Sequence, residues 1–197
     1  PIKEIYFKKV REALNQKKIK MHIDGARIFN AAIALNTSVK RLAKNTDSIT
    51  CCLSKGLSAP IGSLIMGNAE FIYQARRIRK SLGGGMRQSG ILAAAGIYSF
   101  ENMISRLEED HENAYQLAFC MSQLSEIKLD IKKVYTNIIF FYLQNTSIKD
   151  DEFILELFNN NIKIDSKGNR KFRIVTHYGF SKKDVKTVIK KLKLILK

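Results

Sequence analysis

The chain has 197 residues, enough for one domain and a small second one, and its 45% hydrophobic content can build a core, which excludes a wholly disordered protein. With 34 Lys and Arg against 18 Asp and Glu, the net charge is +16, so anionic partners such as phosphates, nucleic acid or acidic membranes have to be considered. No apolar run of about 18 residues is present, and charges interrupt the N-terminal apolar stretches. We therefore expect neither a membrane span nor a secretory signal.

The three cysteines, Cys51, Cys52 and Cys120, lack the paired spacing of a disulfide framework or a zinc site. We expect reduced, small core side chains in a cytoplasmic protein, with no metal site.

Glycine, proline and charge are unevenly distributed along the chain. Residues 1–96 contain nine of the eleven glycines and both prolines, with 17 basic and 5 acidic residues, whereas residues 97–197 contain 17 basic and 13 acidic residues. This change predicts a boundary near residue 97 and, with the helix and strand patterns, three regions: a glycine-rich domain over 1–96, connecting helices over 97–126 and a small α+β domain over 127–197.

The first region alternates between helical and strand patterns. Helices are predicted over 5–15, 27–35, 39–44 and 70–81, the last with Asn68 as N-cap and Gly83 to Gly85 as its stop, and short strands over 19–24, 48–53 and 61–66. This order predicts an α/β layer with a mainly parallel sheet. Because three strands are few for such a sheet, part of its apolar surface is expected to lack a partner.

The second half reads as helices and shorter strands. One or two helices are predicted over 86–122, strands within 131–143, a helix over 150–160, strands over 162–164 and 172–175, and a basic terminal helix capped by Ser181.

Three motifs lie where strands of the first region end, which is where open α/β sheets build their sites. In HIDGAR (22–27), Asp24 ends a strand and Arg27 begins a helix, so that they can hold a cationic ring and an anionic group together. In SKGL (54–57), Lys55 follows an apolar strand, and partial desolvation would favour the neutral amine, which attacks an aldehyde. In KSLGGGMR (80–87), Lys80 and Arg87 flank three glycines, a pattern that suits a phosphate.

Each motif also has a plainer interpretation. Asp24 could be a helix N-cap, Lys55 an ordinary surface lysine, and the glycine triplet a flexible hinge. The joint occurrence of the three motifs, with Asp24 and Lys55 one α/β unit apart, favours a common site.

The stretches HIDGARIFNAA, SKGLSAPIGSLIMG and RKSLGGGMRQSGILAAAG, in this order, closely resemble the low-specificity L-threonine aldolases, which are pyridoxal-phosphate-dependent enzymes of the aspartate-aminotransferase-like fold type I. The resemblance is nearly continuous from Met21 to Gly96 and continues more loosely through FRIVTH at 172–177. It implies the C-terminal part of a fold-type I large domain followed by a small α+β domain.

The resemblance implies a role for each site residue. Lys55 would form the Schiff base with the cofactor aldehyde, and Asp24 would pair with the pyridine nitrogen. Arg27 and Arg173 would bind the substrate carboxylate, Arg27 near the ring as well. Ser54, Lys80 and Arg87 would also contact the cofactor, the last two at a subunit boundary, which implies a homo-oligomer, dimer or tetramer.

The implied reaction is the retro-aldol cleavage of L-threonine or L-allo-threonine to glycine and acetaldehyde. Members of this family carry a substantial portion ahead of the HIDGAR strand, with the main phosphate cup and the ring-stacking residue, so we expect this chain to be a truncated member. The three histidines offer no replacement: His22 is expected to pack beside its strand, His111 to be solvated, and His177 to lie in the core or on the surface.

Other functions stay open. The chain could serve another fold-type I lyase or aminotransferase, or be a non-catalytic remnant. Nucleic-acid binding is disfavoured because no binding motif is present and aromatic residues are not interleaved with the basic cluster around Arg76 to Lys80. The expected partner is an amino-acid substrate, without nucleic acid or membrane.

Overall fold

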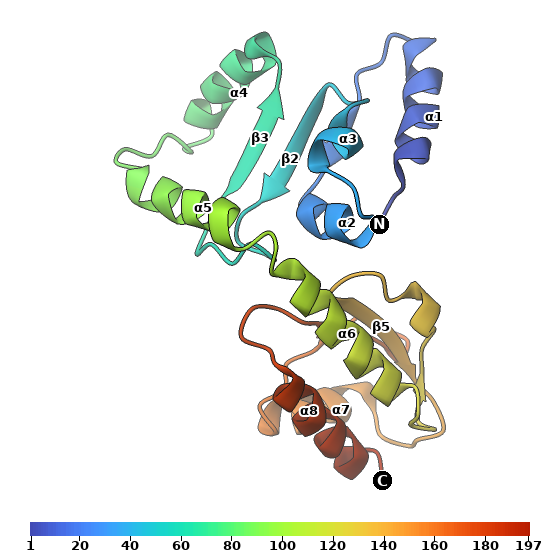
Figure 1. Cartoon of the computed structure of the whole chain (residues 1–197). Helices are drawn as coiled ribbons and strands as arrows, with labels where there is room; N and C mark the ends of the chain where they lie inside the picture. Colours follow the sequence, from blue (N-terminus) through green and yellow to red (C-terminus); the bar gives the residue numbers. More distant parts are fainter. The chain divides into compact units, whose positions relative to one another are not determined.

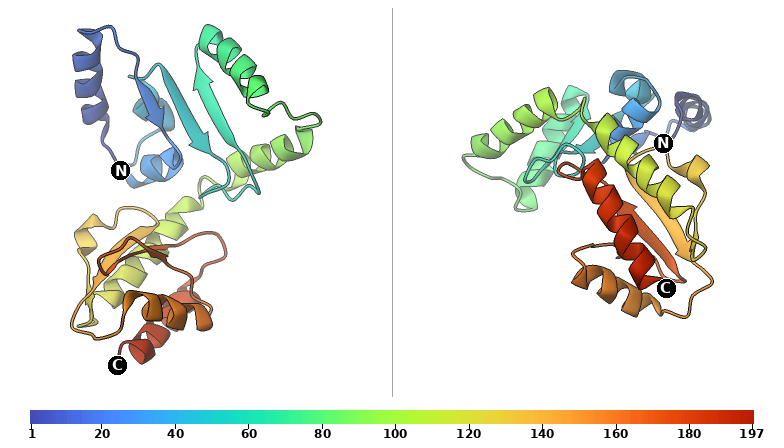
Figure 2. Two further views of the ribbon diagram at one scale, coloured as in Figure 1. Left: turned by 180° about the vertical axis from the view of Figure 1, so that it is seen from behind. Right: turned by 60° about the horizontal axis from the view of Figure 1, so that its bottom comes forward.

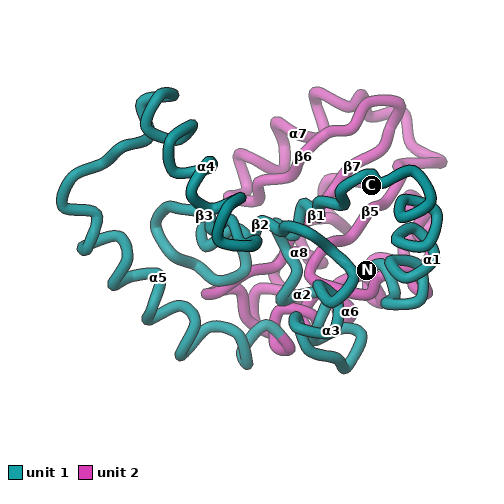
Figure 3. Tube along the Cα trace, turned by 90° about the horizontal axis from the view of Figure 1, so that it is seen from above, with its two compact units in different colours: residues 1–107 teal, residues 108–197 magenta.

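The computed structural model describes all 197 residues, which form two compact units, Pro1–Leu107 and Glu108–Lys197 (Figure 3). Each unit has its own hydrophobic core and its own sheet. Of the predicted connecting helices, the one that ends at Asn102 belongs to the first unit, and all but the first residue of the next helix belong to the second. None of the helices is long and apolar enough to cross a membrane.

The first unit alternates helices and strands largely as predicted (Figure 1). Its elements are α1 (Glu4–Asn15), β1 (His22–Asp24), α2 (Ile28–Ala34), α3 (Val39–Ala43), β2 (Ser48–Cys52), β3 (Ser63–Gly67), α4 (Ala69–Ser81) and α5 (Gly90–Asn102). The sheet has the order β1-β2-β3. The predicted cap of α4 is confirmed, because the Asn68 side chain accepts a hydrogen bond from the Phe71 amide at 2.8 Å.

The sheet of the first unit is mixed rather than mainly parallel. β1 and β2 are parallel, but β2 and β3 are antiparallel, with Ile49 opposite Met66. The cause is the connection: residues 53–62 contain no helix, and a parallel crossover needs a dozen or more residues and usually a helix. The fold class is α/β as predicted, and the strand direction of 61–66 is the correction.

The core of the first unit lies on one face of β1 and β2. Ile23 and Ile49 are opposite each other and pack against Ile28 of α2 and Leu42 of α3, while apolar residues of α1 contact the same cluster. Cys51 is buried beside them, and all three cysteines are free, as expected. The buried face explains why Ile23 is apolar, whereas His22 and Asp24 on either side of it are exposed.

Beyond β2 the sheet has an apolar surface without a partner. Every residue of β3 is exposed, with Leu64 at 40%, Ile65 at 44% and Met66 at 39% relative exposure. The adjoining helix α4 buries no residue, and it lies beside β3 in both views of Figure 2. The expected shortage of partners is therefore confirmed.

The second unit is a four-stranded antiparallel sheet with helices on one face. Its elements are α6 (Leu107–Met121, whose first residue belongs to the first unit), β4 (Ile127–Lys128), the 3₁₀ helix η1 (Ile131–Lys133), β5 (Ile138–Leu143), α7 (Asp150–Asn159), β6 (Asp165–Ser166), β7 (Lys171–Val175) and α8 (Lys182–Ile195). The strand order is β4-β5-β7-β6. Phe141, Phe153 and Phe172 are fully buried and contact one another at the centre of the core.

Two strand predictions in the second unit are wrong in position. Residues 131–133 form a 3₁₀ turn because the Asp130 side chain accepts a hydrogen bond from the Lys132 amide at 3.1 Å. Residues 162–164 are not a strand; the left-handed Asn161, at φ +60°, ends the α7 segment, and pairing begins only at Asp165. The predicted cap of α8 is confirmed: Ser181 and Asp184 form a reciprocal capping box.

Candidate functional site

Two predicted site residues, Asp24 and Lys55, lie at or just beyond the ends of neighbouring parallel strands. Asp24 is the last residue of β1 and lies opposite Thr50 of β2, and Lys55 follows the end of β2 by three residues. Parallel strands end at the same edge of a sheet, so both residues belong to the edge where open α/β sheets bind ligands. Both side chains are exposed.

The turn after β1 leaves the Asp24 carboxylate facing outward. Its Oδ1 accepts a hydrogen bond from the Ala26 amide at 3.0 Å, while the Gly25 carbonyl accepts one from Ile28 at 2.9 Å. The N-cap residue of α2 is Arg27, which makes no side-chain cap. The interpretation of Asp24 as a helix cap is therefore wrong, because its carboxylate accepts a hydrogen bond within the turn that precedes the helix.

Gly25 has to be a glycine because the neighbouring strand covers it. A Cβ at this position would lie 2.5 Å from the Thr50 carbonyl oxygen and 3.1 Å from the Ile49 side chain. The close approach fixes the end of β1 against β2. It also sets the position of Asp24 relative to the segment that carries Lys55.

The loop that carries Lys55 is anchored by a buried leucine on each side of it. Leu53 and Leu57 are 6% and 2% exposed and pack with Met103 and Leu107, whereas Ser54 and Lys55 between them are exposed. Gly56 is closely covered, since a Cβ there would lie 2.8 Å from Asn30 Oδ1. The amine thus projects from an anchored loop, but the partial desolvation that we expected for it is absent in this chain.

The glycine loop of the first unit separates α4 from α5. Lys80 and Arg87 are exposed at its two sides, and the Lys80 side chain crosses Gly85 so closely that a Cβ there would lie 2.5 Å from Lys80 Cδ. Gly83 adopts φ +81°, a left-handed conformation that ends α4. The loop therefore offers two cations and open backbone, as a phosphate requires.

Arg173 lies on β7 of the second unit and already has an acidic partner. Its Nη2 is 2.7 Å from Asp165 Oδ2, while its Nε is buried and has no hydrogen-bond partner. Hydrogen bonding by Lys167, with a smaller contribution from Arg173, holds the pKa of the Asp165 carboxyl below its usual range. Asp165 is the residue that sequence reasoning missed, because the predicted strand ended one residue before it.

Each of the three histidines has a local setting in the structure. His22 Nδ1 is 2.8 Å from Ser48 Oγ across the paired strands, as expected for a structural residue, and His177 is exposed. His111 is half-buried rather than solvated, and this burial lowers its pKa despite the neighbouring Asp110 and Glu108. No cluster of His, Cys, Asp and Glu could hold a metal ion.

The residues of the first unit fit a planar cofactor that carries an aldehyde, a ring nitrogen and a phosphate. An exposed amine, an exposed carboxylate and a glycine loop with two cations match those three groups in kind. A groove of about 870 Å³ lies between α4 and the strands β2 and β3 of this unit. None of the predicted site residues lines it. Arg173 belongs to the second unit.

Comparison with solved structures identifies the fold. A Listeria monocytogenes protein assigned provisionally as an L-allo-threonine aldolase matches 99% of this chain with a TM-score of 0.82 and 20% sequence identity, and the match covers 57% of that protein. The chain therefore shares the fold of that protein over nearly its whole length.

The chain belongs to the beta-eliminating lyase family, whose pattern matches residues 1–146. It is 40% identical over 181 residues to low-specificity L-threonine aldolase 1 of Arabidopsis thaliana, with 91% of this chain and 51% of that protein covered. It is 49% identical over 135 residues to the low specificity L-threonine aldolase of Escherichia coli K12, with 68% and 40% covered. The chain therefore spans about half the length of the curated relatives it matches.

Proposed function

We propose that this chain supplies the lysine, the aspartate and the carboxylate-binding arginines of a pyridoxal-phosphate-dependent aldolase that cleaves L-threonine or L-allo-threonine to glycine and acetaldehyde. The observation that carries the proposal is the pair Asp24 and Lys55, both exposed at the ends of adjacent parallel strands that Gly25 holds in close contact. The names of the Arabidopsis and E. coli relatives support the choice of reaction.

The cofactor, when bound, would accept the electron pair of the broken Cα–Cβ bond. Lys55 would hold the cofactor aldehyde through its amine, and Asp24 would keep the ring nitrogen protonated through its carboxylate. Ser54, Lys80 and Arg87 would bind the phosphate end. In the net reaction the β-hydroxyl loses a proton and Cα gains one, so no oxidant is needed.

The substrate carboxylate would be bound by Arg27 and Arg173. Arg173 Nη2 lies 2.7 Å from Asp165 Oδ2. The substrate carboxylate would therefore have to bind the guanidinium together with Asp165 or displace Asp165 from it. Binding at this end would set which bond at Cα stands perpendicular to the cofactor ring and is therefore cleaved.

The proposed function also implies an oligomeric state, a location and a metabolic role. A homo-oligomer, dimer or tetramer, would follow if Lys80 and Arg87 act at a subunit boundary, and a cytoplasmic location fits the three free cysteines. The metabolic role would be in threonine breakdown and glycine formation.

The identity of the product tests the proposed function. The portion of the Arabidopsis enzyme without a counterpart in this chain is fused ahead of Pro1, and the fusion is incubated with pyridoxal phosphate and L-threonine or L-allo-threonine. We expect equimolar glycine and acetaldehyde, lost in Lys55→Ala and retained in Lys44→Ala, a lysine of the first unit outside the motifs.

Formation of 2-oxo acid instead of acetaldehyde would assign another fold-type I reaction. A folded, cofactor-loaded fusion without any turnover would favour a non-catalytic remnant.

A further inference from the structure

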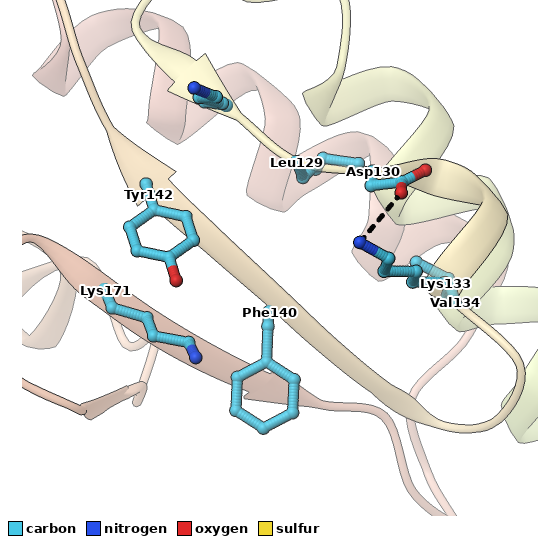
Figure 4. Close-up of a pocket in the computed structure, with 8 residues that line it drawn as sticks. Leu129, Asp130, Lys133, Val134, Phe140, Tyr142 and Lys171 are labelled. Carbon is cyan, nitrogen blue, oxygen red and sulfur yellow. Dashed lines mark ion pairs between the residues drawn. The ribbon is translucent and has the colours of Figure 1, made fainter. Parts of the chain in front are cut away.

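A second hollow, outside the predicted cofactor and substrate residues, lies on the open face of the sheet in the second unit (Figure 4). Its volume is about 450 Å³, within the range of small-molecule pockets. Its polar and aromatic lining consists of Lys128, Asp130, Lys133, Phe140, Tyr142 and Lys171.

The two aromatic rings of this hollow do not belong to the core. Along β5 the alternate residues Ile139, Phe141 and Leu143 are buried against the helices, whereas Phe140 is 47% and Tyr142 42% exposed on the opposite face. Single exposed apolar residues are ordinary, but two neighbouring rings on one face form an exposed aromatic patch. Such a surface suits a planar ring.

A lysine ammonium lies close to both of these rings. The pairing of β5 with β7 sets Tyr142 opposite Lys171, whose Nζ lies 5.1 Å from the Phe140 ring centre and 5.5 Å from that of Tyr142. Figure 4 shows Lys171 extending between the two rings.

The acidic side of the lining is small. Lys133 pairs with Asp130 at 3.3 Å, whereas neither Lys128 nor Lys171 forms an ion pair. Three lysines and one aspartate leave the lining with a charge of +2. The hollow therefore combines exposed aromatic rings with two ammonium groups that have no carboxylate partner, of which that of Lys171 lies over the rings.

We propose that this hollow binds a nucleoside monophosphate, with the base on Phe140 and Tyr142 and the phosphate at Lys128 and Lys171. A neutral aromatic ligand would leave the lysines unused, and a small inorganic anion would leave the rings unused. A phosphate carries between about one and a half and two negative charges at pH 7, which matches the charge of the lining better than one carboxylate does. Base stacking on aromatic side chains supplies the other half of the recognition.

Calorimetric titration of the 197-residue chain tests the proposal, with adenosine monophosphate, adenosine and inorganic phosphate as probes. We expect adenosine monophosphate to bind at least tenfold more tightly than either fragment. Added sodium chloride should weaken the binding of adenosine monophosphate and leave that of adenosine unchanged, because only the former depends on the lysines.

Matched variants separate this site from the general positive charge of the chain. Phe140→Ala and Lys171→Gln should each weaken adenosine monophosphate roughly tenfold. Lys132→Gln, an exposed lysine beside the hollow, and Phe158→Ala, an exposed ring also paired with a lysine, should leave binding unchanged. Thermal unfolding followed by circular dichroism identifies any variant that does not fold.

Three results would overturn the proposal. The first is binding of adenosine monophosphate no tighter than that of phosphate. The second is an equal loss in Lys132→Gln and Lys171→Gln, which would reveal attraction by the net charge alone. The third is binding of an eight-nucleotide single strand without binding of the mononucleotide, which would assign the face to extended nucleic acid.

Discussion

Replacement of Gly25 by alanine should loosen the first unit at the strand end that carries Asp24. The added Cβ would lie 2.5 Å from the Thr50 carbonyl oxygen, against an ordinary C···O contact of about 3.3 Å, so the two strands have to separate by roughly 0.8 Å. Because the neighbour is backbone of the paired strand, it cannot rotate away. Overpacking of this kind costs about 1–3 kcal/mol.

Cys51 offers a local assay for this loosening. It lies in β2 one residue beyond Thr50 and is 2% exposed, and burial raises the pKa of its thiol, so a thiol reagent reaches it only when the strands open. In a background with Cys52→Ser and Cys120→Ser, Gly25→Ala should label roughly 5- to 150-fold faster than the parent, the factor that corresponds to that energy.

Gly90→Ala is the matched control. Gly90 begins α5, and no atom lies within 4 Å of a Cβ placed there, so the labelling rate should stay at the parent value. An unchanged rate in Gly25→Ala, or an equal increase in both variants, would refute the steric reasoning.

Three further predictions concern Asp47, Arg170 and Lys55. Asp47 accepts hydrogen bonds from Arg11 at 2.6 Å and from a backbone amide at 2.7 Å, which hold its pKa below the usual range, so the stability advantage over Asp47→Asn should be full at neutral pH and disappear as pH falls through the lowered pKa, measured by urea unfolding. Arg170 donates to three carbonyl oxygens at 3.0–3.2 Å, and Arg170→Met should cost on the order of 2 kcal/mol in thermal unfolding. Because the Lys55 amine is exposed, the 197-residue chain alone should show no saturable absorbance of lysine-bound cofactor at equimolar pyridoxal phosphate.

Local signals in the sequence predicted much of the fold. The sequence patterns located six of the α-helices and the stretch that holds α5 and α6, without dividing it between them. The caps at Asn68 and Ser181 were correct because capping depends on a side chain and the amide two or three residues later. The direction of β3 was missed because it depends on the length and content of the connection after β2. The strands predicted within 131–143 begin later than expected, because the Asp130 side chain accepts a hydrogen bond from the Lys132 amide and residues 131–133 form a 3₁₀ helix.

The candidate site was predictable only in part. The motifs predicted Asp24 and Lys55 at strand ends, and the structure has both there, while their roles stay predictions. The exposure of Lys55 was not predictable, because burial depends on segments distant in the sequence. The partner of Arg173 was not predicted because it depends on the pairing of β6 with β7, which sets Asp165 opposite Arg173. The same holds for the hollow at Phe140, whose lysines come from β4, η1 and β7.

The most direct test of the proposed function is to find which lysine forms the covalent bond to the cofactor. The fusion with the Arabidopsis portion is loaded with one equivalent of pyridoxal phosphate and reduced with borohydride, and the modified peptide is mapped by mass spectrometry. We expect modification at Lys55, at one cofactor per chain, and its loss in Lys55→Ala. Modification chiefly at another lysine, or undiminished modification in Lys55→Ala, would contradict it.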